Sequence, residues 1–205
     1  KPVPEVISLI SSIAIRKFSK MSIAGIDYSL TCPAICIFTG KTRDKFTFNK
    51  CLFFFLTDVQ KQAKTFAKNI VGERLSSYSQ ECERYDSISE WACDKVLGSH
   101  QVALEGYAYG AKGRVFHIAE NTGILKYKLY QRGTPVEIIE PTRVKKFATG
   151  KGNAPKREMY DFFYAETGVN LKDMVTPDKK DITNPVGDIV DAYYICKCLH
   201  DSLLG

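Results

Sequence analysis

Two short apolar segments, each of strand length and each ending in a carboxylate, constrain the fold more than any other feature. Residues 22–27 read Ser-Ile-Ala-Gly-Ile-Asp, and residues 101–105 read Gln-Val-Ala-Leu-Glu. Runs of this length and composition are typical of strands that are buried on both faces of a sheet. The sequence therefore predicts a covered sheet in which two inner strands end at Asp27 and Glu105.

The rest of the chain alternates between strand and helix patterns. Further strands are predicted at 33–38, 45–56 and 135–139. Helical patterns occupy much of 58–98 and the segments 114–129, 155–167 and 186–204, with a short turn or helix after Pro141 and an exposed loop at 170–185. This order predicts an α/β fold, a mixed five-stranded sheet with helices on both faces. One domain, 21–205, is enough, and 1–20 are interpreted as an N-terminal extension: a leader, a genuine N-terminal helix or an artificial addition.

The cysteines, histidines and charge narrow the class of protein. The seven cysteines and three histidines form no zinc-binding pattern, so any metal must be held by carboxylates. Unpaired cysteines favour a reducing compartment, so the protein is expected to be cytoplasmic, or in a nucleoid or an organellar matrix. No apolar run reaches the roughly 20 residues that span a bilayer, so no membrane partner is expected. The net charge of +6 suits a polyanionic partner.

A second pair of acids lies near the C-terminus, in the sequence Gly187-Asp-Ile-Val-Asp191. Asp188 and Asp191 are three residues apart, so on a helix they share one face. A lone acid at the end of a strand is more often a turn or capping residue than a ligand, and the pair at 188 and 191 could also cap the start of a helix. Together with Asp27 and Glu105 they could form a cluster of four carboxylates, whose mutual repulsion two divalent cations would relieve. Oxygen ligands suit Mg²⁺, with Mn²⁺ as a substitute, and two such ions can hydrolyse a phosphodiester.

The order of these acids resembles that of the RuvC family of Holliday-junction resolvases. Gly25-Ile-Asp27, then Ala103-Leu-Glu105, then the pair at 188 and 191 match the family pattern. The segment 140–156, Glu-Pro-Thr-Arg-Val-Lys-Lys-Phe-Ala-Thr-Gly-Lys-Gly-Asn-Ala-Pro-Lys, is similar to the family's Val-Lys, its Gly-x-Gly loop and the lysine that opens the next helix. The resemblance extends over about 21–204.

The resemblance implies an RNase H-like fold and a Mg²⁺-dependent crossover junction endonuclease. It makes Asp27, Glu105, Asp188 and Asp191 catalytic metal ligands, and it places Lys145 and Lys156 near the scissile phosphate. The region between Arg43 and Gly98 is longer than in the family, which implies an extra helix or an enlarged hairpin. Family members carry an aromatic wedge just after the second acid, where Tyr107 and Tyr109 flank Ala108.

Basic residues around Gly150-Lys-Gly152 form a candidate DNA-binding surface independently of the family. Glycines allow a backbone to approach a phosphate closely, and nearby cations neutralise it. The residues are Lys145, Lys146, Lys151, Lys156 and Arg157. A second basic and aromatic patch, Tyr107, Tyr109, Lys112 and Arg114, could stack on unpaired bases. Both patches could also be ordinary solvated loops.

Three functional hypotheses remain open from the sequence. The first is a homodimeric resolvase that cuts branched DNA at two symmetric positions, with one site in each subunit. The second keeps the chemistry but acts on a flap, a fork or an RNA–DNA hybrid. The third is a non-catalytic RNase H-like module that binds nucleic acid, which predicts an eroded set of acids.

Overall fold

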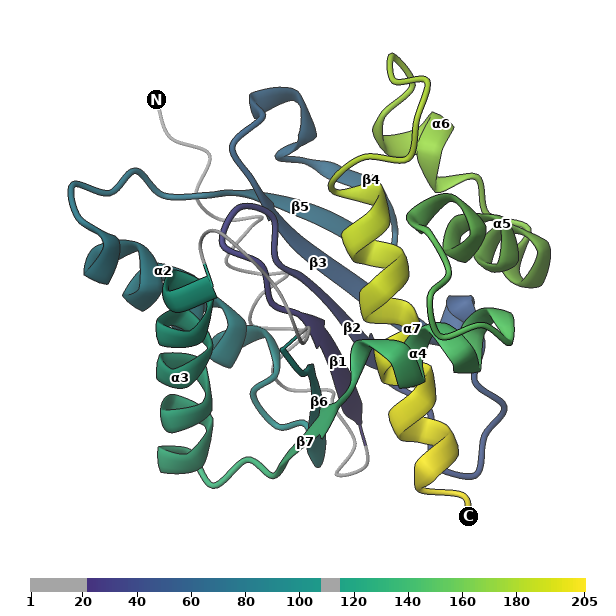
Figure 1. Ribbon diagram of the computed structural model, residues 1–205, viewed down its shortest axis with the longest axis horizontal. Coiled ribbons are helices and arrows are strands. Elements are labelled where there is room, and N and C mark those ends of the chain that lie inside the picture. The colour runs from purple at the N-terminus through teal and green to yellow at the C-terminus, as the bar shows by residue number, and fades with distance from the viewer. Residues whose placement is uncertain (1–21, 108–114) are drawn as a thin grey trace.

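The computed structural model describes residues 22–107 and 115–205, and its centre is one mixed sheet (Figure 1). The strand order is β4-β5-β3-β2-β1-β6-β7. The strands are β1 (Ile23–Asp27), β2 (Ala34–Phe38), β3 (Cys51–Thr57), β4 (Thr65–Ala67), β5 (Ile70–Arg74), β6 (Gln101–Glu105) and β7 (Val136–Ile139). The helices are α2 (Glu81–Lys95), α3 (Val115–Gln131), α4 (Pro141–Thr149), α5 (Lys156–Thr167), α6 (Leu171–Val175) and α7 (Val186–Ser202), with 3₁₀ turns η1 (Phe48–Lys50) and η2 (Gln60–Gln62).

Strand direction brings several strand ends to one edge of the sheet. β1 is antiparallel to β2, and β2 is antiparallel to β3, so β1 and β3 run the same way. β5 is parallel to β3, β6 is parallel to β1, and β7 is parallel to β6. The C-terminal ends of β1, β3, β5, β6 and β7 therefore lie at a common edge, which carries Asp27, Arg74 and Glu105.

Helices cover both faces of the sheet, as the sequence predicts. On one face, side chains such as Cys36, Phe53 and Ala103 pack against α7, α5 and α4. On the other face, Ile26 and Leu104 pack against α2 and α3. Successive residues of a strand point to opposite faces, so strands that are apolar throughout supply both cores.

Gly25 allows α7 to cross β1 at very close range. A Cβ atom at this position would lie 2.2 Å from the backbone nitrogen of Cys196 and 2.7 Å from the carbonyl oxygen of Ala192. No side chain can be accommodated at those distances, so glycine is required by the contact and not by its backbone conformation. The close crossing brings the first turns of α7 beside the end of β1.

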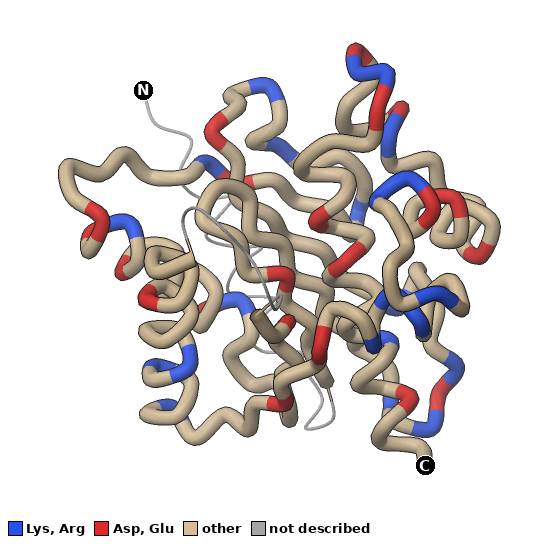
Figure 2. Tube along the Cα trace, viewed as in Figure 1, with Lys and Arg blue, Asp and Glu red and all other residues tan. Residues whose placement is uncertain are grey.

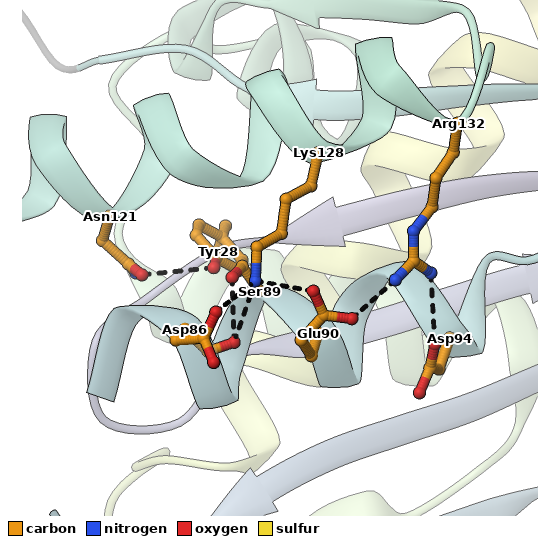
Figure 3. A network of polar contacts seen from close by, with 8 residues as sticks. All are labelled: Tyr28, Asp86, Ser89, Glu90, Asp94, Asn121, Lys128 and Arg132. Carbon is orange, nitrogen blue, oxygen red and sulfur yellow. Dashed lines mark hydrogen bonds and ion pairs between the residues drawn. The ribbon is translucent and has the colours of Figure 1, made fainter. Parts of the chain in front are cut away.

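Ion pairs join α2 and α3, and a buried hydrogen bond joins α3 to Tyr28, the residue that follows β1 (Figure 3). Lys128 of α3 lies 2.7 Å from both Asp86 and Glu90 of α2. Arg132 bridges Glu90 and Asp94. Most of these acids are exposed, so each pair contributes little alone, and the apolar contacts beneath them carry most of the stability.

The region between β3 and α2 differs from the sequence expectation. A largely helical segment was expected at 58–98, and only α2 and the short η2 are helical there. Instead β4 and β5 extend the sheet beside β3, so the sheet has seven strands and not five. The side chain of Asn69 anchors this hairpin, since its Nδ2 donates to the carbonyl oxygen of Cys51 at 3.0 Å. The resemblance implied either an extra helix or an enlarged hairpin between Arg43 and Gly98. The additional β4–β5 pair corresponds to the second alternative.

Two smaller expectations are also corrected. The strand expected at 45–56 begins only at Cys51, because Phe46 and Phe48 turn inward and join the core under α7 and α5. The loop expected at 170–185 includes the one-turn helix α6, whose N-terminus is capped by Asn170.

The cysteines are reduced and mostly buried. All seven are free, and Cys82 is the one that is exposed. None of the helices in the described ranges is long and apolar enough to cross a bilayer.

Candidate active site

Asp27 and Glu105 lie next to each other at the ends of neighbouring parallel strands. Ile26 pairs with Leu104, so the residues that follow them end their strands side by side. Both carboxylates line one cavity of about 400 Å³, with Leu30 and Ile118 on its walls. Adjacent parallel strands are what brings together two acids that are far apart in the sequence.

α7 contributes the other two carboxylates. Asp188 and Asp191 lie in its first two turns, on the part of the helix that crosses β1. Asp188 is only 3% exposed. Its Oδ2 atom is buried and accepts no hydrogen bond from any residue that the structure describes. A buried carboxylate oxygen without a partner is costly, unless a ligand that the protein binds completes its coordination.

The pKa values show that the four carboxylates interact. Burial, and then the charges of Asp188, Asp191 and Glu105, raise the pKa of Asp27 well above its usual range. Burial and the charge of Asp191 raise the pKa of Glu105 to about 7. Burial raises the pKa of Asp191 to about 6, although Lys156 lowers it. Like charges in a dry site disfavour ionisation, so a cation is needed to keep all four ionised at neutral pH.

Lys156 is the basic residue nearest to this cluster. Its Nζ atom lies 3.4 Å from Oδ1 of Asp188 and 3.2 Å from Oδ1 of Asn184. Its aliphatic chain passes over Gly187, where a Cβ atom would lie 3.2 Å from Lys156 Cδ. Burial opposes its charge, but Asp188, Asp191 and Asp27 together raise the pKa of Lys156. Lys156 is therefore charged and held in place from several sides.

Lys145 also faces the acids, from α4. Its charge lowers the pKa of both Glu105 and Asp191 against the effect of burial. It lies within α4, where the sequence predicted a short turn or helix after Pro141, so its backbone is held by the helix. Figure 2 shows basic positions along α4 and at the start of α5, close to the acidic positions where β1, β6 and α7 meet.

The other predicted DNA-binding residues divide into three groups. Lys151 pairs with Glu158 at 2.8 Å and Arg157 with Asp161 at 3.0 Å, so acids of α5 partly neutralise them. Lys146 is exposed on α4, and Tyr107 lines the cavity beside Asp27. Three predicted residues lie outside the described residues: Tyr109, Lys112 and Arg114.

Two residues that the sequence analysis did not identify hold the loop after Asp27. The hydroxyl of Tyr28 donates to Asn121 Oδ1 of α3 at 3.2 Å (Figure 3). Arg84 of α2 is 4% exposed and donates to the carbonyl oxygen of Leu30 from Nε at 3.1 Å and from Nη2 at 2.7 Å. Its position four residues before the buried Ile88 was the available signal, because it places a charge on the inner face of the helix.

The donor set suits hard divalent cations. Four carboxylates, one with a free buried oxygen, match the oxygen ligands that Mg²⁺ and Mn²⁺ take. Within the described ranges, no three acidic, histidine or cysteine side chains already enclose a metal position. The contact of Lys156 with Asp188 at 3.4 Å supplies one positive charge beside these carboxylates, and bound cations would supply the rest.

The raised pKa values predict that the metal-free protein loses stability as the pH rises. The pKa of Glu105 is about 7 and that of Asp191 about 6, against ordinary values of 4.5 and 3.8. At a pH between the ordinary and the raised pKa of each group, the folded protein binds more protons than the unfolded chain. The free energy of unfolding therefore falls as the pH rises. The slope is at most about 1.4 kcal/mol per pH unit for each proton, and the loss continues as the pH rises through the folded pKa of Glu105, about 7.

Urea unfolding at several pH values between about 5 and 8, in EDTA, measures this effect. We expect Mg²⁺ to restore the stability lost at the higher pH, because cations favour the ionised carboxylates. Glu105→Gln should flatten the pH dependence, whereas Asp181→Asn, an exposed site in the segment before α7, should leave it unchanged. A wild-type protein that is equally stable across this range would contradict the pKa values.

Known proteins are similar to this chain in part of the sequence and in most of the fold. No family model matches the chain. The crossover junction endodeoxyribonuclease RuvC of Rhodopirellula baltica is 35% identical to it over 78 residues, which cover 38% of this chain and 38% of that protein. The aligned stretch thus spans well under half of the curated relative.

Solved resolvase structures are similar over most of the chain. Thermus thermophilus RuvC has a TM-score of 0.58 at 15% identity, covering 90% of this chain and 97% of that one. The same protein in complex with a Holliday junction substrate has a TM-score of 0.55 at 15% identity, covering 85% and 92%. The yeast mitochondrial Holliday junction resolvase Ydc2 has a TM-score of 0.53 at 11% identity, covering 94% and 84%.

These comparisons confirm the RNase H-like fold and the resemblance to RuvC-like Holliday junction resolvases. The sheet of this chain has two strands more than the five that were predicted, and the additional pair is the β4–β5 hairpin.

Proposed function

We propose that this protein is a divalent-metal-dependent endonuclease that cleaves four-way DNA junctions. One observation carries the proposal. β1, β6 and α7 bring together four acids, three of which raise the pKa of the fourth, Asp27, and a lysine contacts them at Asp188. The fold and the partial sequence match to a crossover junction endodeoxyribonuclease support it.

Each residue of the site has a distinct task in this proposal. Asp27, Glu105, Asp188 and Asp191 are the metal ligands. When bound, two Mg²⁺ ions supply an activated water and stabilise the leaving 3′ oxygen of the phosphodiester. Lys156 stabilises the negative charge that builds on the scissile phosphate, and Lys145 assists from α4. Leu30 and Ile118 add apolar surface to the wall of the cavity that Asp27 and Glu105 line.

The basic positions of α4 and α5 support a nucleic-acid substrate. Lys146 is exposed and lies in a surface groove with Arg143 and Gly152. Lys151 and Arg157 are paired with acids, so we expect them to exchange these partners for phosphates at a cost in affinity. A DNA substrate also fits the expectation of a reducing compartment that contains DNA.

A homodimer is part of the proposal, because a four-way junction has two symmetric positions to cut. α3 carries an outward row of aromatic side chains: Phe116 is 80% exposed, Tyr127 is 61% exposed and Tyr130 is 79% exposed. They lie on one face of the helix together with Gly123, where an added Cβ would meet nothing within 4 Å. Exposed aromatic rows of this kind are typical of protein interfaces.

The double variant Phe116→Asp with Tyr130→Asp is expected to sediment as a monomer, because two buried charges would oppose association. Phe162→Asp, an exposed aromatic site on α5, is the control and should leave the oligomeric state unchanged. Analytical ultracentrifugation at micromolar concentration measures both. A wild-type protein that is monomeric at those concentrations would exclude the dimer.

A substrate panel tests the function as a whole. A four-way junction, a flap, a linear duplex and an RNA–DNA hybrid are incubated with the protein in Mg²⁺, Mn²⁺, Ca²⁺ or EDTA. We expect paired cuts in the junction with Mg²⁺ or Mn²⁺ and binding with little cleavage in Ca²⁺, whose looser ligand shell positions water poorly. Preferred cleavage of the flap or the hybrid would replace the proposed substrate, and robust cutting in EDTA would remove the metal.

A further inference from the structure

We propose that a cavity beside the carboxylate site binds a single DNA strand through its backbone and one base. The cavity has a volume of about 670 Å³ and lies between the β1–β2 loop and the segment that joins β5 to α2. It is lined by Thr31, Asp58, Arg74, Ser77, Tyr78 and Arg84, among others. We call it the β5–α2 cavity. The proposal rests on the proposed function and adds a second contact region for the same substrate.

The β5–α2 cavity adjoins the carboxylates. Arg74 ends β5 at the sheet edge that also carries Asp27 and Glu105. Thr31 lines both the β5–α2 cavity and the smaller cavity that contains the two acids. A strand that has its phosphate at Asp27 can therefore continue past Thr31 to Arg74. In Figure 1 the β5–α2 segment extends to the side of β1 opposite α5, so the two regions flank the carboxylates.

Tyr78 is preset as a stacking surface. The Arg84 guanidinium lies 4.9 Å from the centre of the Tyr78 ring, in cation–π contact. Arg84 itself is buried and fixed by its two hydrogen bonds to Leu30, so it cannot move away from the ring. Tyr78 is 42% exposed. A ring that is held on one face and open on the other can stack on any of the four bases.

Arg74 supplies the free positive charge of the cavity. It is exposed, and it forms no ion pair with any residue in the described part of the chain. The hydroxyls of Thr31 and Ser77 line the same space, and such groups commonly donate to phosphate oxygens. Asp58 is the one acid among the lining residues, and Arg84 pairs with Glu81 at 3.5 Å, so Arg74 is the lining cation that remains available to a phosphate.

This combination favours a nucleic-acid strand over a peptide. An unpaired guanidinium and hydroxyl groups suit a phosphodiester backbone, and a flat exposed ring beside them suits a base. Leu75 is the one aliphatic side chain among the residues that line the cavity, and most of the others are polar or charged. A strand unpaired at a branch point offers both a phosphate and an unstacked base at this position.

Binding of a fluorescein-labelled single-stranded thymidylate oligonucleotide of about 12 residues, followed by anisotropy in EDTA, tests the cavity without cleavage. Dissociation constants are measured between about 50 and 200 mM salt. We expect Arg74→Gln to reduce the salt slope by about 0.7, the value for one phosphate contact on a single strand. Tyr78→Ala should weaken binding about fivefold or more at every salt concentration, whereas Tyr78→Phe keeps the ring and should bind within about twofold of wild type.

Arg43→Gln is the matched control, since Arg43 is exposed in the β2–β3 connection at the opposite edge of the sheet. Its salt slope should equal that of the wild type. An Arg74→Gln slope equal to that of Arg43→Gln, or a Tyr78→Ala affinity equal to that of wild type, overturns the proposal. Because this assay needs no turnover, a protein that binds as described but cuts no junction would refute the proposed function and leave the β5–α2 cavity standing.

Discussion

Asp27→Asn is expected to abolish junction cleavage while leaving junction binding intact or tighter. Asp27 ends the central strand β1, and three other carboxylates raise its pKa, so it is the most tightly coupled of the four acids. An amide keeps the size of the side chain but removes the negative charge that a cation needs. Metal contacts commonly contribute several kcal/mol to the transition state, so we expect cleavage to fall by more than about a hundredfold.

Binding should respond in the opposite direction, because the same carboxylate repels phosphate. Asp201→Asn is the matched control: Asp201 is exposed at the far end of α7, away from the cluster. Single-turnover cleavage and gel-shift affinity of both variants are compared with those of the wild type. Retention of more than a few per cent of the cleavage rate in Asp27→Asn would contradict its assignment as a metal ligand.

Lys156→Ala has the second largest expected effect. The contacts of Lys156 with Asn184, Asp188 and Gly187 hold its ammonium group beside the carboxylates before any substrate binds. A preorganised charge near the scissile phosphate stabilises the transition state more than the ground state, and only that excess raises the rate. Loss of one such contact costs about 3 kcal/mol, so the rate at saturating enzyme should fall about a hundredfold.

The adjacent residue provides the control. Arg157 is also basic and lies on the same helix, but it pairs with Asp161. Arg157→Gln should weaken binding and reduce its salt dependence while the saturated single-turnover rate stays near that of the wild type. If Lys156→Ala behaves in the same way as Arg157→Gln, Lys156 is a docking residue and not part of the chemistry.

The sequence predicted the acid cluster better than it predicted the sheet. Asp27 and Glu105 end strands whose apolar runs are unmistakable, and Asp188 and Asp191 share a helix face by spacing alone. Local pattern was sufficient for both features. The tertiary contact between α7 and β1 brings the two pairs of acids together. α7 can approach β1 only because Gly25 has no side chain, and the sequence alone does not show that requirement.

The features that were missed depend on contacts between distant residues. β4 is only three residues long and is flanked by Lys64 and Lys68. Its sequence therefore gives no strand pattern, and the surrounding segment was predicted to be helical. Arg84 looks like a surface residue of α2 until its two hydrogen bonds to Leu30 are known. The one local signal was a charged residue on the inner face of a helix, and this signal does not indicate that Leu30 is its hydrogen-bond partner.

The distribution of thiols has a practical consequence for measurement. Cys82 is exposed, while the other six cysteines are buried, so a maleimide dye should react selectively with α2 in the native protein. Cys82 follows Tyr78 by four residues, which places the dye next to the β5–α2 cavity without altering a residue that lines it. Energy transfer from this dye to an acceptor on one arm of a junction would report how each arm is oriented on the protein. A second dye on the partner subunit of a dimer would report the separation of the two halves in the same experiment.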